Sequence, residues 1–123
     1  MTQIVFHSEV DMNKKLNTQA VNRMFEGILT LESVEECFDF FEDLCTVNEL
    51  LSLSQRFEVA SMLIGHETYL KIAEKTGAST ATISRVNRSL NYGNDAYIRV
   101  FEKLEKKAAK ASKASKSQEK DAE

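Results

Sequence analysis

The sequence predicts an all-α fold of about six helices, for three reasons. Its 123 residues contain no proline and only four glycines, so few residues interrupt a helix. Apolar residues make up 42% of the chain, which is enough to form a core. They recur at spacings of three and four residues, the period of a helix that buries one face, and no segment of any length alternates as a strand does.

The first three expected helices are amphipathic. The first starts near Leu16. The second and third follow Ser33 and Thr46, each of which precedes a glutamate by three residues, the spacing of a capping box. Gly65 is expected to end the third helix. The inward face of this helix is expected to carry Val47, Leu50, Leu51, Phe57, Ala60, Leu63 and Ile64.

Three shorter patterns predict the remaining helices. A fourth helix spans about residues 69–76. The fifth begins at Ser79 or Thr80, both of which can cap a helix, and ends at Gly93. Asn94 is expected to cap the sixth.

Segments without a helical pattern are expected to flank one folded domain. Residues 1–13 show no helical period and are expected to form a flexible N-terminal segment. Residues 14–106 carry the large apolar side chains and are expected to fold as the domain. Residues 107–123 are rich in Lys, Ala and Ser and lack large apolar residues, so the sequence predicts a disordered tail there.

Hydropathy and cysteine spacing predict a cytoplasmic protein. No apolar run approaches the ~20 residues needed to cross a bilayer and no signal peptide is visible, so no membrane partner is expected. Cys37 and Cys45 lie eight residues apart, which fits neither a CxxC motif nor a zinc site. They are expected to be buried free thiols in a reducing compartment.

Charge is distributed unevenly along the chain, whose formal net charge is −3. Residues 26–58 hold nine acidic side chains against Arg56 alone. Residues 67–101 hold five basic side chains against three acidic ones, and residues 103–123 hold seven against four. The net charge counts against a polyanion partner for the whole surface, but the asymmetry indicates where such a partner would bind.

The helices expected between residues 16 and 64 have more apolar surface than one chain can cover. Their apolar faces are wide, and a third helix of about 18 residues spans ~27 Å. A chain with ~100 ordered residues would leave much of that surface in water, and exposed apolar patches of several hundred Å² usually mark an interface. The sequence therefore predicts a homodimer that interlocks these helices.

Residues 69–86, YLKIAEKTGASTATISRV, have the register of a helix-turn-helix. Ala73 supplies a small residue where the two helices would meet. Gly77 supplies, four positions later, the tolerance of positive φ that the tight turn requires. Ile83 and Val86 would anchor the second helix in the core. The expected motif covers about residues 69–92, and an ordinary helical hairpin is the alternative.

The second helix of this motif would present a small, hydroxylated and basic outer face, made of Thr80, Ala81, Ser84, Arg85 and Arg88. Small residues let the start of a helix approach the floor of the DNA major groove. Hydroxyl groups can bond base edges or phosphates, and arginine can reach guanine. No acidic residue occurs between positions 77 and 94, which favours a polyanion as the partner of this face.

The same stretch resembles a known family. LCTVNELLSLSQRFEVASMLIGHETYLKIAEKTG and the ASTATISRVNRSLNYGNDAY that follows look like the YerC/YecD branch of the Trp-repressor-like proteins, over roughly Met24–Phe101. The resemblance implies an intertwined all-α homodimer that binds double-stranded operator DNA, as a repressor, at a palindromic site. Positions with which the Trp repressor reads DNA match Thr80, Ala81, Thr82 and Ser84. The full set of expected DNA-binding residues is Lys71, Ser79, Thr80, Ala81, Thr82, Ser84, Arg85 and Arg88.

The resemblance also places a candidate effector pocket at Gln55, Arg56, Arg85 and Ser89. Arg85 and Ser89 match positions that contact tryptophan in the Trp repressor. The second arginine that clamps tryptophan falls on Gln55, beside Arg56, and Val86 replaces the glycine against which the indole packs. The sequence therefore predicts no cofactor and no control by tryptophan, and leaves open an unknown small-molecule effector.

An enzyme and an interaction module are the alternatives to a DNA-binding regulator. His7 and His66 have no Cys, Asp or Glu at metal-ligand spacing on one helical face, so no metal site is expected. The chain has no Gly-rich phosphate loop and no nucleophile motif, so the sequence predicts that it is not an enzyme. A helical dimer that serves as a protein-interaction or RNA-binding module stays as the alternative function.

Overall fold

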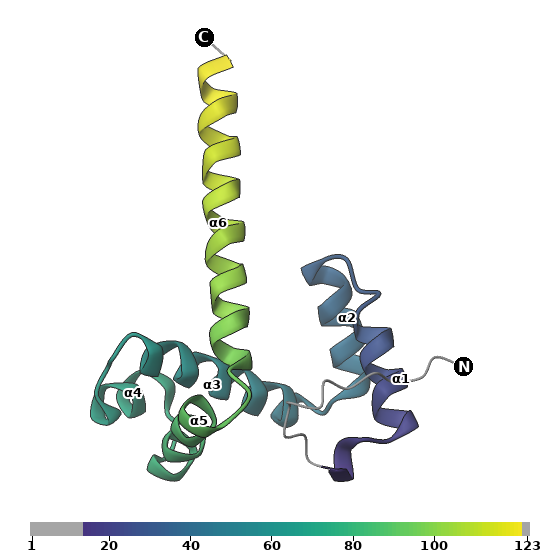
Figure 1. Ribbon diagram of the computed structural model, residues 1–123, viewed down its shortest axis with the longest axis vertical. Helices are drawn as coiled ribbons and strands as arrows, with labels where there is room; N and C mark the ends of the chain where they lie inside the picture. The colour runs from purple at the N-terminus through teal and green to yellow at the C-terminus, as the bar shows by residue number, and fades with distance from the viewer. Residues whose placement is uncertain (1–13, 122–123) are drawn as a thin grey trace. The chain divides into compact units, whose positions relative to one another are not determined.

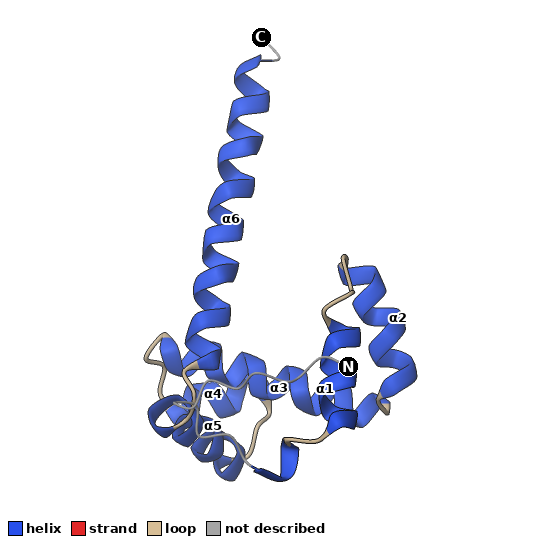
Figure 2. Cartoon of the chain, turned by 45° about the vertical axis from the view of Figure 1, so that its right-hand side comes forward, coloured by secondary structure: helices blue, strands red, loops and turns tan. Residues whose placement is uncertain are grey.

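A computed structural model describes residues 14–121, and every regular element in that range is helical (Figure 1, Figure 2). The all-α fold of six helices, predicted from the sequence, is confirmed for these residues. The expected flexible segment 1–13 lies outside them. A 3-10 turn at Lys14–Leu16 precedes α1 (Gln19–Ile28), α2 (Val34–Leu44), α3 (Val47–Ile64), α4 (Tyr69–Thr76), α5 (Thr80–Tyr92) and α6 (Ala96–Asp121).

The described chain forms two compact units where the sequence predicted one domain. The first unit ends at Leu53 and holds α1, α2 and the start of α3. The second begins at Ser54 and holds the rest of α3 with α4, α5 and α6. Within the second unit, α4 and α5 pack against each other, and α6 projects away from them as one rod (Figure 1).

The buried core of the described residues lies in the second unit. Tyr97 and Phe101 of α6 pack against it. The ring of Phe101 stacks on that of Phe57 in α3, with centroids 4.5 Å apart and an interplanar angle of 23°. These contacts hold the start of α6 against α3 and against the core that α3 shares with α4 and α5. The core itself consists of Val59, Ala60, Ile72, Ala78, Ile83 and Val86.

The described part of the first unit, residues 14–53, has no comparable core. No residue of α1 or α2 is buried. Leu29, Val34 and Phe38 are 83%, 67% and 64% exposed, although large apolar side chains normally gain free energy by leaving water. The wide apolar faces predicted for these helices are therefore present, and residues 14–121 leave much of them exposed.

The predicted inward face of α3 is wrong at three of its seven positions. Val47, Leu51 and Ile64 are exposed, whereas Val59, which the prediction omitted, is fully buried. The apolar residues of α3 face different neighbours along the helix. Its second half is covered by the core of the second unit, whereas in its first half Val47 and Leu51 are left exposed by the described residues.

The prediction of buried thiols is also wrong for a single chain. Cys37 is exposed and Cys45 is half-buried, and both are free. The cause is the same as for α3, because the described residues leave Cys37 and the neighbouring Phe38 of α2 exposed.

Capping hydrogen bonds support the predicted starts of α2 and α3. At α2, the N–H of Glu36 donates to Ser33 Oγ over 3.1 Å. At α3 the box is reciprocal, because Thr46 N donates to Glu49 Oε1 over 2.9 Å and Glu49 N donates to Thr46 Oγ1 over 3.1 Å. The backbone N–H of Thr46, and then its hydroxyl, lower the pKa of the Glu49 carboxyl below its ordinary value.

Two helix boundaries differ in detail from the prediction. α3 ends before Gly65, as predicted, but the left-handed residue is His66, with φ of 62°. α6 is preceded by Asp95, at φ of 58°, and not capped by the side chain of Asn94. The carbonyl oxygen of Asn94 instead accepts a hydrogen bond from Arg99 Nη1 over 2.8 Å.

The prediction of a disordered tail is wrong as far as Asp121, because α6 continues through it. Alanine and lysine are among the strongest helix formers, so a segment without large apolar residues can still be helical. The packed turns around Tyr97 and Phe101 supply the costly nucleus from which the helix propagates. Residues 102–116 are all exposed, so this helix extends without contributing to the core.

Removal of residues 107–123 should therefore leave the core intact. We expect the melting temperature to change by less than about 2 °C, because the deleted turns bury no side chain in residues 107–116. Circular dichroism should show a loss of helical signal in proportion to the residues removed. A fall of 10 °C or more, on the order of that expected when the packing of a core is disturbed, would show that the tail is docked.

The Thr46–Glu49 cap predicts a pH-dependent contribution to stability. The pKa of Glu49 is lower in the folded chain than its ordinary value of 4.5, so its contribution is present above that value and is lost as pH falls through the folded pKa. Glu49→Gln should be less stable than the parent at pH 7, and the difference should shrink below pH ~4. Thermal melts of the parent and the variant, at pH 7 and below pH ~4, measure this difference in stability. Glu58→Gln controls for the loss of a negative charge from α3, and a gap of equal size at both pH values would contradict the assignment.

Candidate nucleic-acid interface

The turn between α4 and α5 has the conformation that the sequence predicted. Gly77 has φ of 72°, in the left-handed region, and its N–H bonds to the carbonyl of Ala73 over 2.9 Å. Ala78 follows with 5% of its surface exposed. Ser79 then caps α5, because its Oγ accepts from Thr82 N over 3.1 Å and donates to Thr82 Oγ1 over 3.0 Å. The start of α5 is thus fixed by hydrogen bonds on both sides of a buried residue.

Gln55 ties this turn to α3. Its side-chain Nε2 donates to the carbonyl oxygen of Thr76 over 3.1 Å, across 21 residues of sequence. The hydroxyl of Thr76 donates to the Ile72 carbonyl over 2.7 Å and accepts from Ala78 N over 3.1 Å. The Gln55 bond satisfies the Thr76 carbonyl, which the end of α4 leaves unpaired, and the Thr76 hydroxyl satisfies the N–H of Ala78 in the turn. Gln55 is therefore a structural residue of the turn, a role that the sequence did not reveal.

α5 has one face in the core and one in solvent. Ile83 and Val86 are 0% and 2% exposed, as the register predicted. The predicted DNA-binding residues of α5 lie on the other side. Thr82 is half-buried, and the exposed members are Thr80, Ala81, Ser84, Arg85 and Arg88. The first turn of α5, with the positive end of the helix dipole, carries the exposed Thr80 and Ala81, and a helix N-terminus of this kind suits a phosphate group.

Lys71 and Ser79 are the two remaining predicted DNA-binding residues, and each already interacts with another side chain. Lys71 lies on α4 and is paired with Glu67, one turn earlier, with Nζ 3.7 Å from Oε2. This exposed pair is weak and a phosphate group can replace the carboxylate. Ser79 is exposed, but its hydroxyl is already engaged by Thr82. Its described role is to cap α5.

Two of the four candidate effector residues, Gln55 and Ser89, are engaged by the protein itself. Gln55 is bound to Thr76, and Ser89 Oγ donates to the carbonyl oxygen of Arg85 over 3.3 Å. Arg56 is half-buried, and its Nε makes no hydrogen bond to the described residues although it is buried. The structure places Gln55 and Arg56 on α3, and Arg85 and Ser89 on α5.

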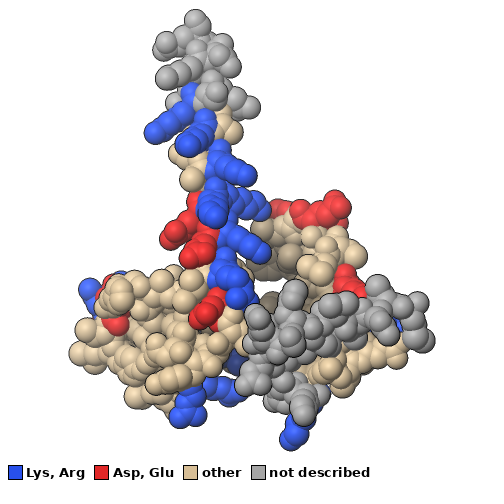
Figure 3. All heavy atoms as spheres, in the orientation of Figure 1, with Lys and Arg blue, Asp and Glu red and all other residues tan. Residues whose placement is uncertain are grey.

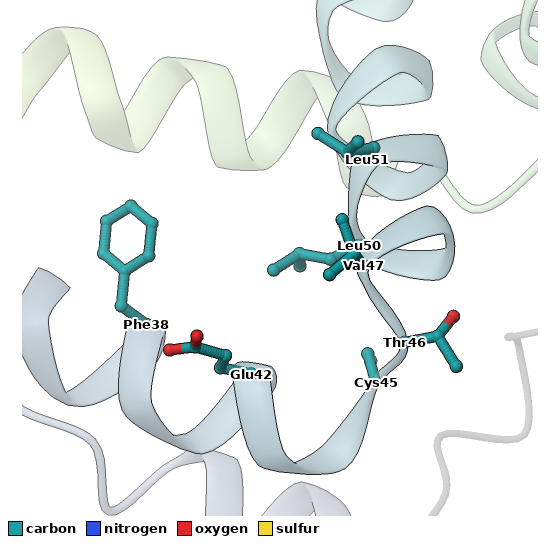
Figure 4. A pocket seen from close by; sticks show the side chains of 7 residues that line it. All are labelled: Phe38, Glu42, Cys45, Thr46, Val47, Leu50 and Leu51. Carbon is teal, nitrogen blue, oxygen red and sulfur yellow. The ribbon is translucent and has the colours of Figure 1, made fainter.

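A hollow of about 230 Å³ lies in the first unit, where the sequence predicted no site (Figure 4). Phe38 of α2 and Leu50 of α3 extend into it from opposite sides. The sequence could not indicate it, because periodicity predicted that both helix faces are covered. Its lining comprises Phe38, Glu42, Cys45, Thr46, Val47, Leu50 and Leu51.

Two other kinds of site are absent from residues 14–121. No group of three or more His, Cys, Asp or Glu side chains in this range could hold a metal ion. None of the helices in the same range combines the length and the apolar character that a membrane span requires.

Comparison with known proteins gives consistent matches. The family model described as Trp repressor protein matches residues 19–105. YerC of Bacillus subtilis strain 168, an uncharacterized protein, is 56% identical over 90 residues, which cover 73% of this chain and 86% of YerC. A TrpR-like protein from Eubacterium eligens, known from a crystal structure, shares 73% sequence identity with this chain. The match has a TM-score of 0.73 and covers 75% of this chain and 95% of that one. A candidate Trp repressor from Staphylococcus aureus is 54% identical, with a TM-score of 0.73 over 75% and 92% of the two chains.

Because Gln55 bonds to Thr76, its substitution should lower the free energy of unfolding more than a substitution at an exposed position of α3. Gln55→Ala should destabilise the protein by ~1–2 kcal/mol, because it leaves the part-buried Thr76 carbonyl without its partner. Ser61→Ala is the matched control, since Ser61 is exposed on the same helix. Chemical denaturation measures both variants. Equal stability of the two variants would show that the Gln55 amide does not stabilise the turn.

Proposed function

The chain belongs to the Trp repressor family, and we propose on this basis that it is a sequence-specific transcriptional repressor. It binds a palindromic operator as a homodimer, with α4 and α5 as its helix-turn-helix. Membership of a family of DNA-binding regulators supports the class of function. The residues that carry it in this chain have to be argued from its own surface.

The observation that carries the proposal is the exposed face at the start of α5. Thr80, Ala81 and Ser84 are exposed and short, so the backbone of the first turn can come close to base edges. Arg85 and Arg88 are exposed beside them, and α5 has no acidic residue to repel phosphate. A helix face selected only for solvation would carry acidic and basic side chains together, which stabilise helices in pairs.

A second chain would complete the molecule. α1, α2 and the first half of α3 expose large apolar side chains, including Phe25, Phe38 and Leu51 at 53%, 64% and 60%. These faces and the hollow between α2 and α3 support a homodimer in which each chain covers the other. A two-fold axis would set the two α5 helices about one turn of DNA apart, ~34 Å, and so require an operator with two-fold symmetry.

Tryptophan is not the effector in this proposal. The side chain of Val86 is part of the core, at 2% exposure, where the Trp repressor has a glycine against the indole. Gln55 has no guanidinium plane and its amide is bound to Thr76. Arg85 is therefore free to act on DNA, and an effector, where one exists, differs in chemistry from tryptophan.

Calorimetry with millimolar L-tryptophan should show no heat of binding to the full chain. The physical reason is steric, since the indole would have to displace Val86 from the core. Val86→Gly is the informative partner variant, because it reopens the space at a cost in stability. Micromolar binding to the parent protein would contradict the prediction.

Selection from a random DNA pool, followed by binding measurements, tests the function. Ala81→Glu should abolish binding to the selected operator without a change in melting temperature, because it adds a negative charge to an exposed helical position. Ala108→Glu adds the same charge to exposed helix in α6 and should bind the operator at least tenfold more tightly than Ala81→Glu, about 1.4 kcal/mol. Parental affinity for Ala81→Glu would remove α5 as the DNA-reading element.

The same measurements separate the two arginines. Arg85 lies nearer the start of α5, so Arg85→Ala should cost ~1–3 kcal/mol and relax specificity at one position in each half-site. Arg88 lies almost one turn later, so Arg88→Ala should weaken binding to all sequences alike. Loss of both effects, together with binding that does not weaken as salt rises, would favour the protein-interaction alternative.

A further inference from the structure

α6 extends well past the part of the chain that the family model covers. The match ends at residue 105, whereas α6 continues to Asp121. Tyr97 and Phe101 pack its first turns onto the core, and residues 102–116 are all exposed. The first turns of α6 are therefore held by the core, but residues 102–116 bury no side chain that would explain why the helix continues.

Five exposed lysines lie on one side of this extension. They follow one another at spacings of three, one, three and three residues, which places them within an arc of roughly 120° on an α-helix. Figure 3 shows Lys and Arg side chains stacked along the exposed length of α6. We call this set the lysine stripe, and it consists of Lys103, Lys106, Lys107, Lys110 and Lys113.

The lysine stripe is electrostatically unfavourable in the free chain. Lys103 and Lys107 are four residues apart, as are Lys106 and Lys110, and like charges at this spacing destabilise a helix. Glu102 and Glu105 lie on the same helix, yet no ion pair within 4.0 Å joins the stripe to a described residue. An anionic partner would replace this repulsion by attraction.

We propose that the lysine stripe is a second DNA-binding surface, which contacts the phosphate backbone without reading bases. This inference rests on the proposed function, because it takes DNA as the polyanion. Lysines are mobile point charges, which suit phosphates at varied positions, whereas base recognition favours the planar fork of arginine. The stripe adds affinity for any sequence and leaves the choice of operator to α5.

The opposite side of the extension argues against an apolar partner or a lipid surface. Between residues 105 and 116 it carries Ala, Ser, Glu105 and Lys116, and no large apolar side chain occurs after Leu104. A membrane-surface helix needs Trp, Phe or Leu opposite its basic face. Charge is thus the only strong interaction that the extension offers.

The test uses the full chain, its selected operator and an unrelated duplex of the same length. The variant Lys106→Gln/Lys107→Gln/Lys110→Gln should lose affinity for both duplexes by the same factor, about tenfold or more at low salt. Its plot of log K against log salt should be less steep by up to ~2.7 per chain, because three lysines no longer neutralise phosphates. The melting temperature should not change, since these side chains are exposed. Parental affinity and slope would overturn the proposal.

A charge-preserving variant separates the stripe from the net charge. In Lys107→Ala/Ala108→Lys/Ala109→Lys/Lys110→Ala the composition is unchanged, but two lysines move off the stripe. We expect weaker binding to both duplexes, and parental binding would overturn the role of the stripe. A failure of the proposed function would look different, because the parent protein itself would then bind the operator and the unrelated duplex equally.

Discussion

The turn at Gly77 is the constraint on which the proposed DNA-reading surface depends. Its left-handed backbone turns the chain between α4 and α5, and Ala78, buried directly after it, anchors the start of α5 in the core. Ile83 and Val86 then fix the rotation of α5 about its axis. The residues left in solvent are a consequence of this geometry, since a helix with one buried face has only one face to offer.

The two compact units differ in how far their described residues bury apolar side chains. The second unit has its own core and a hydrogen-bonded turn, so α5 is supported within a single chain. The first unit exposes its apolar faces and has no buried residue in α1 or α2. In the proposed homodimer, association completes the hydrophobic core and, by setting the separation of two α5 helices, also determines the spacing of the operator.

Local signals in the sequence predicted most of the helices and the turn. Ser33, Thr46 and Gly77 act through neighbours a few residues away, and so their roles could be inferred from spacing alone. The Gln55–Thr76 bond joins residues 21 apart and leaves no periodic signal. The exposure of Val47 and Cys37 could not be predicted either, because periodicity identifies an apolar face but not the chain that covers it. The helix in residues 107–121 could not be predicted from low complexity, because alanine and lysine form helices without large apolar neighbours.

In the proposed complex, two copies of α5 lie in successive major grooves on one side of an operator. Hydroxyl-radical footprinting of the full chain on its selected operator measures this arrangement. We expect two protected segments related by two-fold symmetry, with centres about one helical turn apart, ~10 base pairs. A single protected segment, or uniform protection without symmetry, would contradict it.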